Sequence, residues 1–211
     1  MRSANKLMRR FLMGALTCLL LATLSTPALS QFTSKVPTQQ SQTVTDSMSV
    51  GKMLDISLES AKSTLVAQGM TESKMKSYVA VLSKQNVVPT SPMTNAQGAV
   101  GGVLVGDRFV VRGNFSSLSS AMRDYGTDPI TPPNPNITSA FHIHQGEPTE
   151  NGPFQYALNV TTDETGRKGS AMGEYALTAE QVQALSEGKL YVDLHTTMNR
   201  AGELRGILMP Y

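Results

Sequence analysis

The amino-acid sequence predicts an all-β antiparallel sandwich, of Ig-like or Greek-key type or as a partly closed barrel, with one short helix and a preceding N-terminal helical hairpin. Many short β-rich runs follow one another from about residue 97, which is typical of sandwiches and small barrels. Apolar residues at helical spacing lie within residues 48–87, and a further helix-capping signal follows near residue 178. Glycines and prolines punctuate the intervals between these runs.

Residues 1–30 have the features of a signal peptide. Basic residues at the start are followed by the apolar run Phe11–Leu24 and by small residues at Ala28 and Ser30. We expect cleavage before Gln31, which leaves a mature chain without cysteine and without a transmembrane span, secreted or in the periplasm. A retained anchor is the alternative, but the apolar run is shorter than the roughly 20 residues that cross a bilayer. A lipid anchor on Cys18 is a weaker alternative, because the residues before it make a poor lipobox.

Signal cleavage also changes the charge of the chain. The whole sequence carries 18 basic and 16 acidic residues, a formal net charge of +2. Four of the basic residues lie in the signal, so fourteen remain against sixteen acidic ones, a mature net charge of about −2. This balance gives no support for binding to nucleic acid or to an anionic membrane, so we expect no nucleic-acid partner.

The segment between the signal and the β-rich region predicts three parts. Residues 31–47 are rich in Gln, Ser and Thr without apolar periodicity, which indicates a disordered tether. Residues 48–87 predict the helical hairpin, and prolines in residues 88–96 mark a linker. The first helix of the hairpin carries apolar residues at helical spacing and the second follows a cap at Thr71, with Gly69 between them as the turn.

The β domain is predicted over residues 97–211. Its proline-rich segment 123–139 predicts a long surface loop. Thr178 and Gln181 have the spacing of a capping box, so a short helix should begin here and end at Gly188. The remaining runs are strand candidates.

The three histidines of the chain all lie in strand candidates. In "AFHIH", alternation places His142 and His144 on one face and the apolar residues on the other. In "KLYVDLHT", Tyr191, Asp193 and His195 share a face opposite three apolar residues. The last candidate, "GELRG", places Glu203 and Arg205 on one face. If these strands are neighbours, their polar faces meet.

Three motifs give the sequence a resemblance to a known family. "GNFSSL", "SAFHIHQGEPTENGP" and "YALTAEQVQALSEGKLYVDLHTTMNRAGELRGIL" resemble the CHRD domain, the repeat named after chordin, over roughly residues 97–211. The resemblance implies an all-β sandwich, an extracytoplasmic location and no established catalytic residue. The sequence departs from the family pattern at Asp193, where the family usually has an amide, and in the long loop 123–139.

The polar faces allow two interpretations. Imidazole is a common ligand of zinc and copper, so His142, His144 and His195 are candidate ligands of either ion. Four further residues would then orient these ligands, or else complete a hydrogen-bonded network that needs no metal, in which Arg205 pairs with an acidic residue. These four are Tyr191, Asp193, Glu203 and Arg205.

We expect an exported, non-catalytic binding or structural module, not an enzyme. The sequence has no nucleophile elbow and no mature cysteine, and it has too few histidines for a dinuclear centre of the superoxide dismutase type. The alternative is a metal-dependent enzyme with an open three-histidine zinc or copper centre. The expected partner is an extracytoplasmic protein or glycan, whose identity the sequence does not give.

Overall fold

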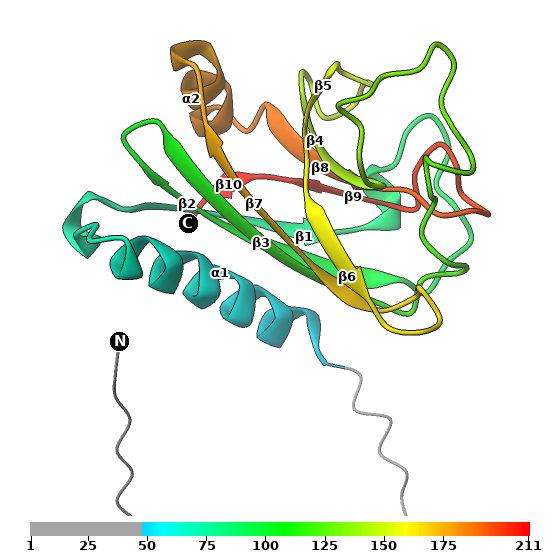
Figure 1. Cartoon of the computed structure of the whole chain (residues 1–211), viewed down its shortest axis with the longest axis horizontal. Coiled ribbons are helices and arrows are strands. Elements are labelled where there is room, and N and C mark those ends of the chain that lie inside the picture. The colour runs from blue at the N-terminus through cyan, green and yellow to red at the C-terminus, as the bar shows by residue number, and fades with distance from the viewer. Residues whose placement is uncertain (1–47) are drawn as a thin grey trace, which may run out of the picture. The chain divides into compact units, whose positions relative to one another are not determined.

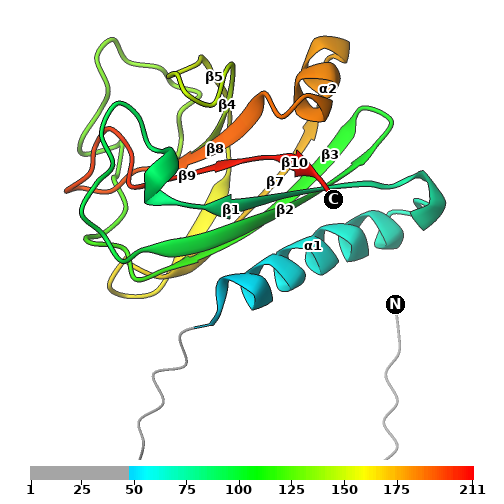
Figure 2. The same ribbon diagram turned by 180° about the vertical axis from the view of Figure 1, so that it is seen from behind.

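The computed structural model describes residues 48–211, so the predicted signal peptide (1–30) and tether (31–47) lie outside the described residues. Two antiparallel sheets pack face to face, and a long helix covers the outer face of the larger sheet (Figures 1 and 2). The prediction of an all-β antiparallel two-sheet fold is confirmed. The described strands do not close into a barrel.

The larger sheet has six strands and the smaller has four. In spatial order, the six are β10 (Met209–Pro210), β1 (Lys76–Leu82), β2 (Gln97–Val105), β3 (Arg108–Ser116), β7 (Gly169–Ala176) and β6 (Asn159–Thr162). The four are β5 (Phe154–Ala157), β4 (Phe141–Gln145), β8 (Leu190–Leu194) and β9 (Leu204–Ile207). Backbone hydrogen bonds between Ser83, after β1, and Arg205 in β9 join the two sheets at one corner.

The main core lies between the sheets and follows the two-residue period of the strands. Leu190, Val192 and Leu194 of β8 face this core, as the sequence predicts, and aromatic residues of β3 and β4 face them. The opposite side of β8 is also buried, because Tyr191 is 0% and Asp193 4% exposed. The outer face of the smaller sheet is therefore enclosed and not a solvated surface.

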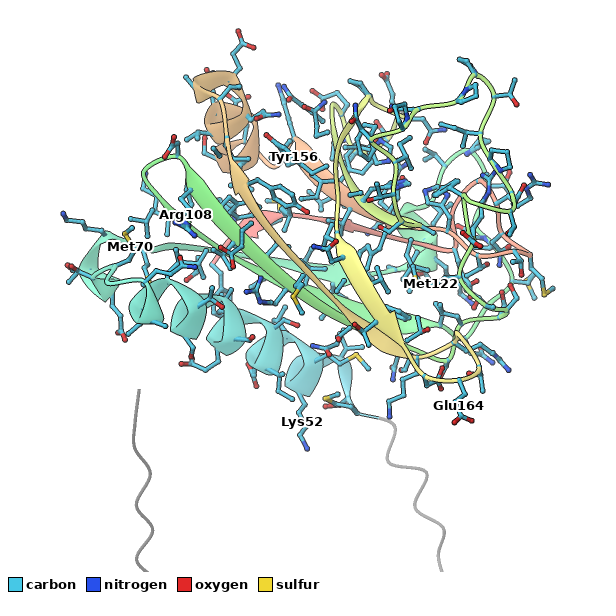
Figure 3. All side chains as sticks on the ribbon, in the orientation of Figure 1. Lys52, Met70, Arg108, Met122, Tyr156 and Glu164 are labelled. Atoms are coloured by element: carbon cyan, nitrogen blue, oxygen red, sulfur yellow. The ribbon has the colours of Figure 1, made fainter. Side chains whose placement is uncertain are left out.

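Helix α1 (Val50–Ala67) is the predicted first helix, with Ser49 as its N-cap. Gly69 follows it with φ +81°, the left-handed turn that the sequence predicts. The apolar face of α1 forms a second core against Val103 of β2 and Val110 of β3. Met70, labelled in Figure 3, packs against this second core from just beyond the helix.

The predicted second helix is wrong, and with it the helical hairpin over residues 48–87. A short 3₁₀ turn, η1 (Glu72–Lys74), is followed by strand β1, which pairs with β2 along its whole length. Tyr78, Ala80 and Leu82 are buried on alternate positions, a two-residue period that only an extended chain can satisfy. The β fold therefore begins upstream of residue 97, and residues 88–96 connect the 3₁₀ turn η2 (Lys84–Asn86) to β2 inside this fold.

Two other local predictions are confirmed. Helix α2 (Ala179–Ser186) begins with the reciprocal capping box of Thr178 and Gln181, and Gly188 follows it at φ +70°. Residues 123–139 contain neither helix nor strand and form a long connection between β3 and β4.

Candidate metal site

The three histidines come together on the outer face of the smaller sheet. Strands β4 and β8 are antiparallel neighbours, with His142 opposite Asp193 and His144 opposite Tyr191. His195 directly follows β8, and its backbone N–H donates to the Ala140 carbonyl just before β4. The pairing of these two strands therefore brings residues 53 positions apart in the sequence into contact.

The histidine rings are close enough to share one ion. The Nε2 atoms of His142 and His195 lie 2.9 Å apart, and one ring nitrogen from each of the three histidines lies within 4.8 Å of the other two. His142 is 3% exposed and His195 9%, whereas His144 is half-buried. Within residues 48–211, no further His, Cys, Asp or Glu joins this set of three.

Backbone carbonyls fix the orientation and tautomer of each ring. The Nδ1 atoms of His142, His144 and His195 lie 3.2, 2.8 and 3.0 Å from the carbonyl oxygens of Ser139, Gly152 and Arg200 respectively. A carbonyl oxygen only accepts hydrogen bonds, so each Nδ1 must carry the proton. Each neutral ring then presents a lone pair on Nε2. The Nε2 atoms of His142 and His195 face each other, and the Nε2 atom of His144 is buried without a hydrogen-bond partner among the described residues.

Burial keeps the rings neutral. It lowers the pKa of His142 well below the ordinary value of 6.5, and the His195 and His144 rings lower this pKa further. Burial also lowers the pKa of His144 and His195, although the Asp193 carboxylate opposes the shift in both. Two neutral rings that both carry their proton on Nδ1 cannot hydrogen-bond through Nε2, so the 2.9 Å contact joins two acceptors.

The acidic residue Asp193 lies beside the histidines, and Arg205 offsets the charge of its carboxylate. Arg205 donates from Nε and Nη2 to the two carboxylate oxygens of Asp193, each over 2.7 Å. The same guanidinium donates to the carbonyls of Pro148 and Glu150 in the loop after β4. Asp193 Oδ2 is 3.8 Å from His144 Nε2. This distance is too long for a hydrogen bond, but the carboxylate charge still acts on the His144 ring.

Comparison with known proteins identifies the family. A family model of the CHRD domain matches residues 78–208, more than half of the chain. The chain belongs to the CHRD family. No curated protein and no solved structure matches it significantly. The match begins within β1, upstream of the residue 97 that the motifs indicate, and includes all three histidines.

CHRD domains are generally not enzymes and are typically extracellular. In this CHRD domain, neither helix of the described part, residues 48–211, has the length and apolar character needed to cross a bilayer.

Tyr191 connects His144 to the loop that orients it. Its ring stacks on the His144 imidazole, with centroids 5.3 Å apart and planes 9° apart, and the Arg205 guanidinium lies over it at 4.2 Å from the ring centroid. The Tyr191 hydroxyl accepts from Gly152 N–H over 2.6 Å and donates to the Glu150 carbonyl over 3.0 Å. Gly152 therefore makes both hydrogen bonds: its N–H donates to the Tyr191 hydroxyl, and its carbonyl accepts from His144 Nδ1.

The structure does not bring Glu203 to this site, although the sequence groups it with the others. Strand β9 begins at Leu204, so Glu203 lies outside the alternation that would place it beside Arg205. Its carboxylate is fully buried elsewhere and accepts hydrogen bonds from four residues: Thr94, Ser119, Thr196 and Asn199. Glu203 and its hydrogen-bond donors thus form a second polar cluster, separate from the histidines. Met122, labelled in Figure 3, forms an isolated antiparallel β-bridge with Thr196 and so lies next to this cluster.

Two aromatic residues near the histidines were not among the predicted site residues. Tyr125, in the proline-rich loop, stacks on His142 with centroids 6.2 Å apart and planes 25° apart. Phe154 of β5 meets the same ring edge-on at 5.6 Å. Neither position has a sequence signal, because one lies in a segment without periodicity and the other in a short edge strand.

The donor set fits a transition-metal ion. Two nitrogens bound tetrahedrally at about 2.0–2.1 Å from a zinc ion lie roughly 3.3 Å apart. The nitrogen separations here, 2.9 Å for the closest pair and at most 4.8 Å for the others, bracket that value. Imidazole nitrogen suits zinc and copper, and each ligand already has the outer hydrogen bond that metal-bound histidine usually makes.

Proposed function

We propose that this CHRD domain is an exported, non-catalytic binding module that holds one zinc or copper ion through His142, His144 and His195. The observation that carries the proposal is that one ring nitrogen from each of the three histidines lies within 4.8 Å of the other two, while the Nδ1 of every ring is held by a backbone carbonyl. A cation satisfies all three acceptors at once, as no hydrogen-bond donor of the described residues does.

A metal-free network is a poorer account of the same atoms. His144 Nε2 is buried and has no hydrogen-bond partner among the described residues. The contact between the Nε2 atoms of His142 and His195 would need a proton from an imidazolium ring, which burial disfavours. Buried polar atoms normally find partners, so these three Nε2 acceptors without a donor favour a bound cation.

The surroundings of the site favour binding over catalysis. A catalytic zinc centre usually works with a general base beside the metal-bound water. Asp193 is the carboxylate nearest to His144, and Arg205 occupies both of its oxygens. We therefore assign the metal a role in holding β4 to the end of β8, where it stabilises a surface for an extracytoplasmic protein or glycan.

Export rests on the N-terminal sequence and on the family. The basic, apolar and small-residue sections of residues 1–30 support a signal peptide that is cleaved before Gln31. The mass of the protein recovered from the periplasm or medium checks this, because a chain that still starts at Met1 contradicts cleavage.

Metal analysis tests the metal site. We expect purified protein, reconstituted with zinc or copper and freed of excess ion, to retain one ion per chain. The double variant His142→Ala, His144→Ala should retain none. Gln145→Ala, a half-buried position on the same strand with no role at the site, is the matched control and should retain the ion. Bound metal should also raise the free energy of unfolding, by about 2.7 kcal/mol when free metal is 100 times its Kd.

The stability measurements separate the two accounts of the histidines. If the double variant does not fold, the single variant His144→Ala removes only the half-buried ring and should fold with much weaker metal binding. Wild-type protein that takes up no ion, together with a large loss of stability in the variants, would contradict the metal site and support a hydrogen-bonded network.

A further inference from the structure

The proline-rich loop 123–139 is fastened to the histidine site at two points. The Arg123 backbone N–H donates to the His195 carbonyl over 3.1 Å, and the Tyr125 ring stacks on His142. The Arg123 guanidinium lies 4.7 Å from the Tyr125 ring centroid and donates from Nε to Asp128 over 2.8 Å. Asp128 also pairs with Arg200, whose carbonyl orients His195. Tyr125 is therefore held in place over one of the candidate metal ligands.

Tyr125 also lines a cavity of about 300 Å³ that the loop forms and that is open to solvent. The cavity wall is mostly apolar and includes Pro129, Ile130, Pro133, Pro135 and Ile137. No charged residue of the described chain belongs to this wall. The volume suits a small organic molecule, and the lining suits an apolar body rather than a bare ion. Tyr125 both lines this cavity and stacks on a candidate ligand, His142.

The electrostatics of the metal site favour an anionic donor. Three neutral imidazoles do not offset the charge of a divalent ion, and the charge of Asp193 is already offset by Arg205. A buried cation without an anionic ligand is costly, so the site gains from an anion at an additional coordination position. The three histidines leave such a position, because no further acidic, cysteine or histidine donor of residues 48–211 joins them.

We propose that the cavity under the proline-rich loop admits a small carboxylate with an apolar body to the metal, and that the Tyr125 ring is the gate between cavity and metal. This inference rests on the proposed metal site. The apolar body would lie among the prolines and isoleucines, and the carboxylate would reach the metal past the ring. The ligand class follows from two properties: the apolar cavity wall suits an apolar body, and the proposed metal suits an anionic donor.

The test uses protein loaded with cobalt, whose visible spectrum reports its coordination, and two probe anions, azide and butanoate. Both anions should give saturable spectral changes in the wild-type protein. Tyr125→Ala removes the ring and should accelerate azide binding by about tenfold or more. Tyr125→Phe keeps the ring and removes only the hydroxyl, so its rates should match the wild type. Ile137→Trp fills the cavity and should weaken the equilibrium affinity for butanoate, whose apolar body needs that space, while leaving the equilibrium affinity for azide unchanged.

Each outcome separates this inference from the proposed metal site. Equal azide rates in Tyr125→Ala and Tyr125→Phe would overturn the gate. Cobalt-loaded wild-type protein that responds to neither anion would overturn the ligand site and leave the metal site standing. Protein that takes up neither cobalt, zinc nor copper would overturn both proposals. If Tyr125→Ala fails to fold, the wild-type spectra and Ile137→Trp still decide the ligand site.

Discussion

The hydrogen bond on the far side of each histidine ring determines what the ring can do at the site. Ser139, Gly152 and Arg200 contribute only backbone carbonyls, and each lies in a connection between strands. A donor at any of these places would move the proton to Nε2 and remove the lone pair that faces the other rings. The chemistry of the site therefore depends on the conformation of three loops as much as on the histidines.

Tyr191→Phe tests this dependence at a single atom. Removing the hydroxyl deprives Gly152 N–H of its acceptor and frees the carbonyl that orients His144. Metal affinity should fall by about 10- to 100-fold, the usual effect of losing an outer hydrogen bond at a metal site. Competition with a chromophoric chelator measures this affinity.

Tyr175→Phe is the matched control for that prediction. The Tyr175 hydroxyl also donates to a backbone carbonyl, that of Ala157, over 2.7 Å, and its ring stacks on Tyr156, which is labelled in Figure 3. Tyr175 lies in β7 of the other sheet, and its hydroxyl and ring contact Ala157 and Tyr156. Equal metal affinities in the two variants would mean that the Tyr191 hydroxyl does not position His144.

At the scale of elements, the seating of α1 on the larger sheet depends on one glycine. A Cβ added at Gly101 in β2 would lie 2.4 Å from the backbone N and 2.5 Å from the Cα of Leu58 in α1. These are main-chain atoms, so the whole helix would have to shift. Gly101→Ala should therefore lower the free energy of unfolding by about 1–3 kcal/mol or more, as overpacking does in cores.

Gly51→Ala is the matched control for Gly101→Ala. Gly51 lies in the first turn of α1, and nothing lies within 4 Å of an added Cβ. Alanine there should be neutral or stabilising by about 0.5–1 kcal/mol, because it favours the helix. Urea unfolding measures both variants, and a Gly101→Ala protein as stable as Gly51→Ala would show that the helix is not tightly seated.

The elements also show where a local reading of the sequence succeeds and fails. Helix α1, helix α2 and the alternation of β8 depend on spacing and caps that lie within a few residues, so the sequence predicts them. Strand β1 depends on its neighbours β2 and β10, and β10 lies at the far end of the chain. Its run "KSYVAVL" alternates, but the cap signal at Thr71 before it favoured a helix, and pairing with distant strands decided the outcome.

For the candidate site as well, the sequence predicts the residues that depend on local spacing and misses the others. The two-residue period predicts that His142 and His144 share a face, and it predicts the polar face of β8. It fails at Glu203, because that residue lies just outside β9. Tyr125 and Gly152 act from loops whose course depends on the folded sandwich, so no spacing in the sequence could indicate them.

At the scale of the whole molecule, Glu203 ties together three connections. It accepts from Thr94 before β2, from Ser119 between β3 and β4, and from Thr196 and Asn199 between β8 and β9. The Glu203 carboxylate is fully buried, and hydrogen bonds, not a cation, stabilise its charge. Connections that are distant in the sequence therefore share one buried anion.

This arrangement makes the fold sensitive to acid. Burial alone would raise the pKa of Glu203, but the hydrogen bonds from Thr196, Thr94 and Ser119 outweigh it and hold the pKa below the ordinary value of 4.5. A carboxylate whose pKa is lowered in the folded state contributes stability above its unfolded pKa. That contribution is lost as the pH falls from 4.5 through the folded value.

Glu203→Gln should remove this contribution. The amide replaces one acceptor oxygen by an NH₂ group that faces donors, so the free energy of unfolding at pH 7 should fall by about 1–3 kcal/mol or more. The difference from the wild type should shrink as the pH falls below 4.5 toward the lowered folded-state pKa, because the unfolded chain then takes up a proton that the folded carboxylate does not. Urea unfolding at pH 7, 5 and 3 measures this, with Glu164→Gln on the exposed turn after β6 as the control. A difference that stays constant over this range would mean that the ionised carboxylate is not what holds the three connections together.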